Sequence, residues 1–130
     1  MEFFEAVTAR ASVRSFEKCD ISAAELEQIV DAGRRAPSGR NTQPCEYIVI
    51  RDENTLEKLG RVQSCIAEAS AAIGVVVDEN ATEFWKEDAA AAIENMLLAV
   101  AALDYASLWV EGYVLKNEVG EEELLEVPDS

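Results

Sequence analysis

The sequence of 130 residues contains no histidine, only three cysteines and no apolar run near the roughly 20 residues that a membrane-spanning helix needs. Cys19, Cys45 and Cys65 are far apart and form neither a CxxC pair nor a Cys/His cluster. We therefore expect reduced, mostly structural thiols and no metal site. The first four residues, MEFF, lack the basic region of a signal peptide, so we expect a soluble, cytoplasmic protein that does not enter a membrane.

Basic residues are scarce and unevenly placed. The formal net charge is -15, whereas nucleic acids and anionic lipids bind net basic surfaces, so we expect neither as a partner. Nine of the eleven basic residues lie between Arg10 and Arg61, while residues 79–130 hold thirteen acidic and two basic ones. The N-terminal half can hold a small anion, although charge counting by itself favours arginines that pair with acidic neighbours.

Apolar periodicity predicts helices separated by strands. We expect buried strands over residues 47–50 and 73–77, and a third strand over residues 107–110. Helices are predicted around residues 3–7 with one apolar face, from the capping box at Ser22–Glu25 to a point before Pro37, around residues 56–62 with a further turn through Ile66, and over residues 117–125.

The longest predicted helix, over residues 84–103, has few polar residues on its later turns. It should be central and largely buried, so Glu94 and Asn95 need partners inside the structure. Helices between strands predict one domain, an α+β sandwich whose sheet is covered on both faces. Three strands make a thin sheet for this core, so a fourth strand is either missing or supplied by a partner chain.

Two loops carry residues suited to ligand binding. Arg10, Ser12 and Arg14 alternate along the chain, so in an extended backbone their side chains point the same way. Such a set suits a phosphate, which arginine binds through two parallel hydrogen bonds. Taken alone, this pattern is weak and favours an ordinary salt-bridged surface loop over a phosphate site. The run APSGRNTQP, residues 36–44, predicts an ordered loop with available backbone donors between a helix and a strand.

In combination, the two loops resemble the N-terminal half of the nitroreductase family, which shows R-x-S-x-R-x-F followed by A-P-S-x-x-N-x-Q-P. Residues 88–99 are similar to that family's central helix, and residues 109–113 are similar to its E-G loop. Compared with the family pattern, the sequence stops before a last strand and a basic tail. The resemblance implies a single FMN-binding domain over residues 1–130, with a central mixed or antiparallel sheet flanked by helices, in an intertwined homodimer.

The resemblance also implies an activity. The chain would be an FMN-dependent oxidoreductase that transfers electrons from NADH or NADPH to a nitroaromatic, quinone or similar small acceptor by a ping-pong mechanism. The flavin carries the chemistry, so no catalytic side chain is expected. A flavin-binding or dimeric interaction module without turnover, and a purely structural acidic domain, remain open alternatives.

Candidate cofactor-binding residues follow from the same resemblance. In the first loop, the FMN phosphate, ribityl chain and pyrimidine edge would be held by Arg10, Ala11, Ser12, Val13 and Arg14. In the second loop, the residues that would reach the flavin of the opposite subunit are Pro37, Ser38 and Gly39.

Three further residues complete the predicted site. Asn41 is interpreted as a residue that orders the loop or contacts the ring edge. The backbone of Glu111 and Gly112 would approach the flavin N5, where glycine permits a close approach.

Overall fold

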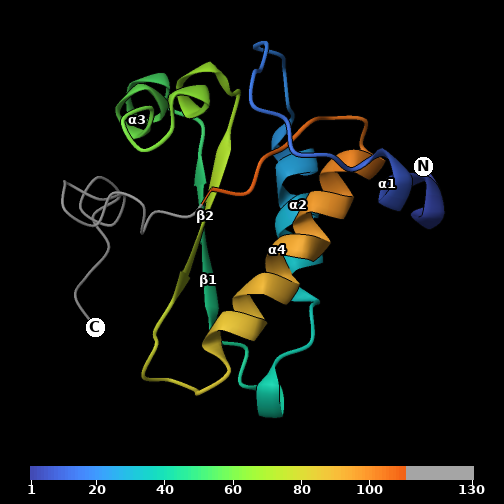
Figure 1. Cartoon of the computed structure of the whole chain (residues 1–130), viewed down its shortest axis with the longest axis vertical. Helices are drawn as coiled ribbons and strands as arrows, with labels where there is room; N and C mark the ends of the chain where they lie inside the picture. The colour runs from blue at the N-terminus through green and yellow to red at the C-terminus, as the bar shows by residue number, and fades with distance from the viewer. Residues whose placement is uncertain (111–130) are drawn as a thin grey trace.

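The computed structural model describes residues 1–110 (Figure 1). Its helices and strands are, in chain order, α1 (Phe3–Ala9), α2 (Ala23–Arg34), β1 (Cys45–Ile50), α3 (Glu53–Leu59), β2 (Ala72–Val77) and α4 (Trp85–Ala102), with short 3-10 helices at Gly39–Asn41 and Ser64–Glu68. The predicted order of elements is confirmed over these residues, except for the third strand. None of the helices described here is long and apolar enough to cross a membrane.

The two strands pair antiparallel along their whole length, from Cys45 opposite Val77 to Ile50 opposite Ala72. Successive side chains of a strand point to opposite faces. Ile48 and Ile50 belong to an apolar cluster with α3, while Val49 lines a groove against α2. Helices α2 and α4 lie along one face of the sheet, and α3 lies at one end of the molecule (Figure 1). The predicted α+β class, with helices packed against an antiparallel sheet, is therefore confirmed.

Helix α4 is the central element, since it contacts α1, α2 and both strands. Asn95 donates its side-chain amide to the Ala32 carbonyl at 3.0 Å, which is the internal partner that the sequence predicted. Glu94, in contrast, keeps an exposed side chain. Alanines on several sides of α4 allow its contacts with α1, α2 and the two strands, because a small side chain lets neighbouring elements approach closely.

The predicted third strand is wrong in the structure. Within residues 107–110 only Ser107 pairs, in a single parallel bridge with Ser12. Val110 instead packs against the α3 cluster. The segment is only half-buried, with Trp109 38% exposed, and its apolar residues do not guarantee a neighbouring strand over several residues. The predicted helix over residues 117–125 lies outside the described residues.

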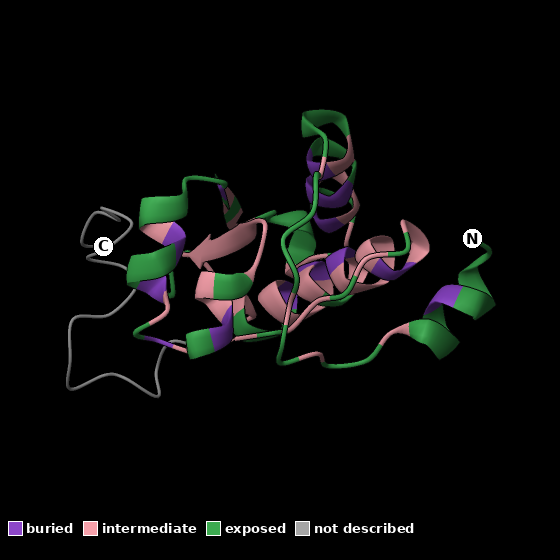
Figure 2. Cartoon of the chain, turned by 90° about the horizontal axis from the view of Figure 1, so that it is seen from above, coloured by how far each residue is buried: buried purple, intermediate pink, exposed green. Residues whose placement is uncertain are grey.

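The apolar face of α1 is not part of the core of this chain. Phe3, Phe4 and Val7 are 62%, 78% and 45% exposed, and only Ala6 is buried. In Figure 2, α1 extends from one side of the molecule with mostly exposed residues. The helix itself was predicted correctly, but its apolar side chains face away from the chain's own interior.

Helix α2 begins with the predicted capping box. The Ser22 hydroxyl accepts the Glu25 amide at 3.1 Å, and the Glu25 carboxylate accepts the Ser22 amide at 3.1 Å. The same carboxylate accepts the Tyr105 hydroxyl at 3.0 Å, so the chain just beyond α4 is tied to the start of α2. Between the end of α4 and Tyr105, Asp104 makes the turn with a left-handed φ of 66°.

This contact predicts a pH-dependent stability difference. Hydrogen bonds from Ser22 and then from Tyr105 lower the pKa of Glu25 below its ordinary 4.5, so their contribution is present above pH 4.5 and is lost as pH falls through the lowered value. Burial and then the bond to Glu25 raise the pKa of Tyr105 above its ordinary 10, so that contribution is lost as pH rises through the raised value.

We expect Tyr105→Phe to lower the urea midpoint at pH 7 and to match the unmodified chain more closely at pH 3. Thr8→Val is the matched control, because the Thr8 hydroxyl donates to a backbone carbonyl, that of Phe4, and not to a carboxylate. Its effect should not change with pH. A Tyr105→Phe effect of constant size down to pH 3 would contradict the assignment.

Candidate functional site

The predicted phosphate-binding segment follows α1 directly and is extended where the structure fixes it. Arg10 has extended dihedrals, φ -60° and ψ 126°, and the Val13 amide donates to the Ser107 carbonyl at 3.0 Å. Arg10 and Val13 are half-buried, while Ala11, Ser12 and Arg14 are exposed. The alternation that the sequence predicted is thus compatible with the backbone, and the donors of Ser12 and Arg14 are open to solvent.

The two arginines of this segment are weakly engaged. Arg10 Nε lies 4.0 Å from the Glu94 carboxylate, with side chains 35% and 50% exposed, so the pair contributes little to stability. Arg14 makes no ion pair with any residue between 1 and 110. Both guanidinium groups can therefore turn toward an anionic ligand at small cost.

The second loop is ordered by its own hydrogen bonds. Ser38 Oγ accepts the Gln43 amide at 3.0 Å, and the Thr42 hydroxyl donates to the Gly39 carbonyl at 3.1 Å. The Asn41 amide donates to the Ser38 carbonyl at 3.0 Å. The predicted ordered loop is confirmed, but the prediction of available backbone donors is wrong for Gly39, Asn41, Thr42 and Gln43, whose amides are already bonded.

Backbone strain is concentrated in this loop. Arg40, Asn41 and Gln43 have φ of 55°, 55° and 50°, in the left-handed region that costs roughly 1–2 kcal/mol for a residue with a side chain. Such conformations persist where the surroundings determine them, and they occur often at functional sites.

Two residues at the N-terminal end of α4 hold the loop in place, and neither was predicted from the sequence to have this role. Asp88 is 5% exposed, and its Oδ1 accepts the Gly39 amide at 2.8 Å. Phe84 lies against Gly39 so closely that an added Cβ would come within 2.3 Å of Phe84 Cδ2. The available signal was a carboxylate in the first turn of an alanine-rich helix.

The structure does not bring the two loops together within one chain. Gly39 lies beside Asp88 in the first turn of α4, whereas Val13 lies beside Ser107, beyond the end of the helix. Asp88 and Ala102 are separated by about 21 Å along a helix axis. In Figure 1 the Gly39–Asn41 turn and α1 lie near opposite ends of α4. Glu111 and Gly112 lie outside the described residues.

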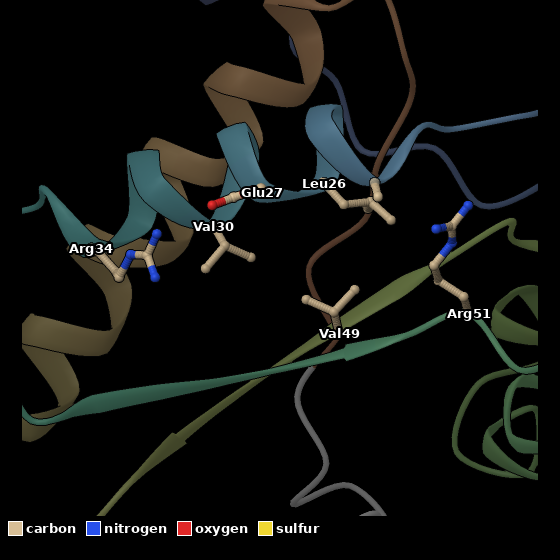
Figure 3. A pocket seen from close by; sticks show the side chains of 7 residues that line it. Leu26, Glu27, Val30, Arg34, Val49 and Arg51 are labelled. Atoms are coloured by element: carbon tan, nitrogen blue, oxygen red, sulfur yellow. The ribbon is translucent and has the colours of Figure 1, made fainter.

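Two hollows of the described surface are lined by residues outside both loops. A groove of about 250 Å³ runs between α2 and β1, with Leu26, Val30 and Val49 facing one another across it (Figure 3). A second hollow of about 350 Å³ is lined by Lys18, Cys19 and Arg51, among others. Cys19 is exposed there, Cys45 is half-buried and Cys65 is buried; all three thiols are free, as predicted, although Cys19 has no place in the core.

The sequence profile described as the Nitroreductase family matches residues 7–85, a range that contains both loops. A protein of Archaeoglobus fulgidus named "Putative NADH dehydrogenase/NAD(P)H nitroreductase" is 33% identical, over 99% of this chain and 79% of its own. This chain belongs to the nitroreductase family.

Solved structures agree with this membership. This chain superimposes with a TM-score of 0.88 on the structure of a "Putative NADH dehydrogenase/NAD(P)H nitroreductase" from Bacteroides thetaiotaomicron. The two are 24% identical, and the match covers 97% of this chain and 77% of that one. A nitroreductase with bound FMN from Bacteroides fragilis gives a TM-score of 0.84 at 25% identity, over 100% of this chain and 81% of that one. The resemblance inferred from the two loops and the central helix is confirmed, and so is the nitroreductase-like fold.

The contact between Gly39 and Phe84 gives a prediction for this nitroreductase. Gly39→Ala places a Cβ against Phe84, and overpacking of this kind costs roughly 1–3 kcal/mol of unfolding free energy. Urea unfolding measures the cost.

The matched test is a double-mutant cycle, because Phe84→Ala removes the ring atom nearest to the added methyl group. The cost of Gly39→Ala should be smaller in the Phe84→Ala background. An equal cost in both backgrounds would show that the clash is not the cause.

Proposed function

We propose that this nitroreductase binds FMN and uses it to pass electrons from NADH or NADPH to a small electron-poor acceptor, such as a nitroaromatic or a quinone. The observation that carries the proposal is the extended segment Arg10–Arg14, whose two guanidinium groups are exposed or half-buried and are not strongly paired within residues 1–110. The names of the relatives, NAD(P)H nitroreductases, and the FMN bound in the Bacteroides fragilis structure support the same cofactor.

The segment fits a phosphate. Arg10 and Arg14 supply charge-assisted donors, Ser12 supplies a hydroxyl, and the backbone of Ala11 and Val13 borders the ribityl chain and the pyrimidine edge. Glu94 lies 4.0 Å from Arg10 and competes for it, so the phosphate replaces or shares a weak ion pair. A cation held near the pyrimidine edge also stabilises negative charge on that ring.

The proposed site needs two copies of the chain. Pro37, Ser38 and Gly39 lie at the far end of α4 from Val13, so in our proposal they reach the FMN held by the opposite subunit, with Asn41 ordering the loop. The exposed apolar residues of α1 support a homodimer, because such patches mark interaction surfaces. Residues 1–130 then form a single FMN-binding domain.

When bound, FMN supplies the redox chemistry, in a ping-pong sequence of NAD(P)H oxidation followed by acceptor reduction. The residues of this chain bind, orient and shield the cofactor. No side chain is proposed as a general acid or base. The backbone of Glu111 and Gly112, beyond the described part of the chain, is proposed to border the reactive side of the ring.

The first experiment is an FMN titration of the purified chain, followed by absorbance and flavin fluorescence, with NADH and NADPH oxidation measured in the presence of a quinone or a nitroaromatic compound. We expect one FMN per subunit and acceptor-dependent oxidation. Bound FMN without oxidation would favour a binding module without turnover. No FMN binding would contradict the proposal.

Arg14→Ala tests the phosphate contact. Loss of a hydrogen bond to a charged group costs about 1.5–3 kcal/mol, so FMN should bind roughly 10–100-fold more weakly. Riboflavin, which lacks the phosphate, should bind the variant and the unmodified chain equally well.

Arg61→Ala removes an exposed arginine beyond α3 and serves as the control for the loss of one positive charge. Its FMN affinity should stay unchanged. An equal loss of FMN and riboflavin binding in Arg14→Ala would place Arg14 away from the phosphate.

A further inference from the structure

Asp88 is a buried carboxylate with one oxygen in use. Its Oδ1 accepts the Gly39 amide at 2.8 Å, whereas its Oδ2 is buried and has no hydrogen-bond partner among the described residues. A buried polar atom without a partner is destabilising, and a buried charge more so. Stability alone therefore does not explain a carboxylate at position 88. Its side chain makes one hydrogen bond, to the Gly39 amide.

That bond connects the strained loop to the rest of the fold. The side-chain hydrogen bonds of Ser38 and Thr42 begin and end within the loop. Among the described residues, only one side chain from outside residues 37–44 hydrogen-bonds to this loop, and it is that of Asp88 in α4. The first turn of α4 favours a negative group at this position, because the amide groups there carry partial positive charge.

The bonded amide stands at a sensitive point of the chain. Pro37 and Ser38 precede the Gly39 amide, and the left-handed residues Arg40 and Asn41 follow it directly. A left-handed conformation persists only where its surroundings enforce it. Without an acceptor for the Gly39 amide, the left-handed residues can relax toward ordinary dihedrals, and the backbone on both sides of Gly39 moves with them.

We propose that Asp88 is a positioning residue, which fixes the backbone of Pro37–Gly39 so that it forms one wall of the FMN site of the opposite subunit. This inference rests on the proposed function. Asp88 does not touch the cofactor in this arrangement. It acts through Gly39, and its second oxygen is left without a partner as a consequence of where the loop must stand.

The Asp88 carboxylate also acts on Cys45, the first residue of β1. Burial and then the charge of Asp88 raise the pKa of the Cys45 thiol. Helix α4 contacts β1, and the loop ends at that strand. Asp88 thus stands where α4, the loop and the sheet meet.

Three variants separate positioning from general stability. Asp88→Ala removes the acceptor, and Asp88→Asn keeps an oxygen acceptor while it removes the charge. Asn95→Ala is the matched control, because Asn95 also makes one side-chain hydrogen bond from α4 to a backbone group, the Ala32 carbonyl of α2, but it does not contact the loop.

The first measurement needs no cofactor. Amide hydrogen exchange of Gly39, followed by NMR on the whole chain, reports whether the loop opens locally. We expect exchange about tenfold faster in Asp88→Ala, and close to the unmodified rate in Asp88→Asn and Asn95→Ala. An unchanged Gly39 rate in Asp88→Ala would overturn the inference.

The second measurement is the FMN dissociation constant of the same proteins by flavin fluorescence. We expect binding about tenfold weaker in Asp88→Ala, restored in Asp88→Asn and unaffected in Asn95→Ala. Equal weakening in Asp88→Ala and Asn95→Ala would show a merely structural role and overturn the inference. If the unmodified chain binds no FMN, the proposed function fails and the flavin role of Asp88 fails with it, while the Gly39 exchange rates still show separately whether Asp88 anchors the loop.

Discussion

The close approach of α2 to α4 at Gly33 is the constraint on which the rest of the structure depends. A Cβ at Gly33 would lie 2.9 Å from Met96 Cγ and 3.1 Å from Tyr47 Cε1, so two helices and β1 meet at a point where only a hydrogen atom fits. Helix α2 ends at Arg34, one residue later. Core packing consequently fixes the start of the loop at residues 36–44. The beginning of β1 fixes its other end.

Features that depend on local spacing could be predicted from the sequence. The capping box at Ser22–Glu25 determines where α2 begins, and the runs of β-branched residues determine β1 and β2, because these signals act over a few neighbouring residues. The two loop motifs, taken in order, also identified the family. Their assignment to FMN contacts stays a prediction.

Features that depend on distant partners could not be predicted in the same way. The apolar pattern of α1 predicted a helix with one apolar face, but Phe4 on that face is exposed, because periodicity does not say which chain covers a face. The amide of Gly39 looked available until the fold placed Asp88, which is 49 positions away in sequence, beside it. Asp104 adopts the left-handed conformation that glycine most often supplies at a helix end, and the sequence carries no glycine there to signal the turn.

The separation of the two loops along α4 has a consequence for the protein in the cell. If each FMN is held by Arg10–Arg14 of one copy and by Pro37–Gly39 of the other, the ligand binds the pair and not the separated chains. A ligand that binds only the assembled state shifts the association equilibrium by mass action. The supply of flavin would then shift the protein toward dimers, and a flavin-starved cell would hold a larger share of separate subunits, with the apolar side chains of α1 facing water.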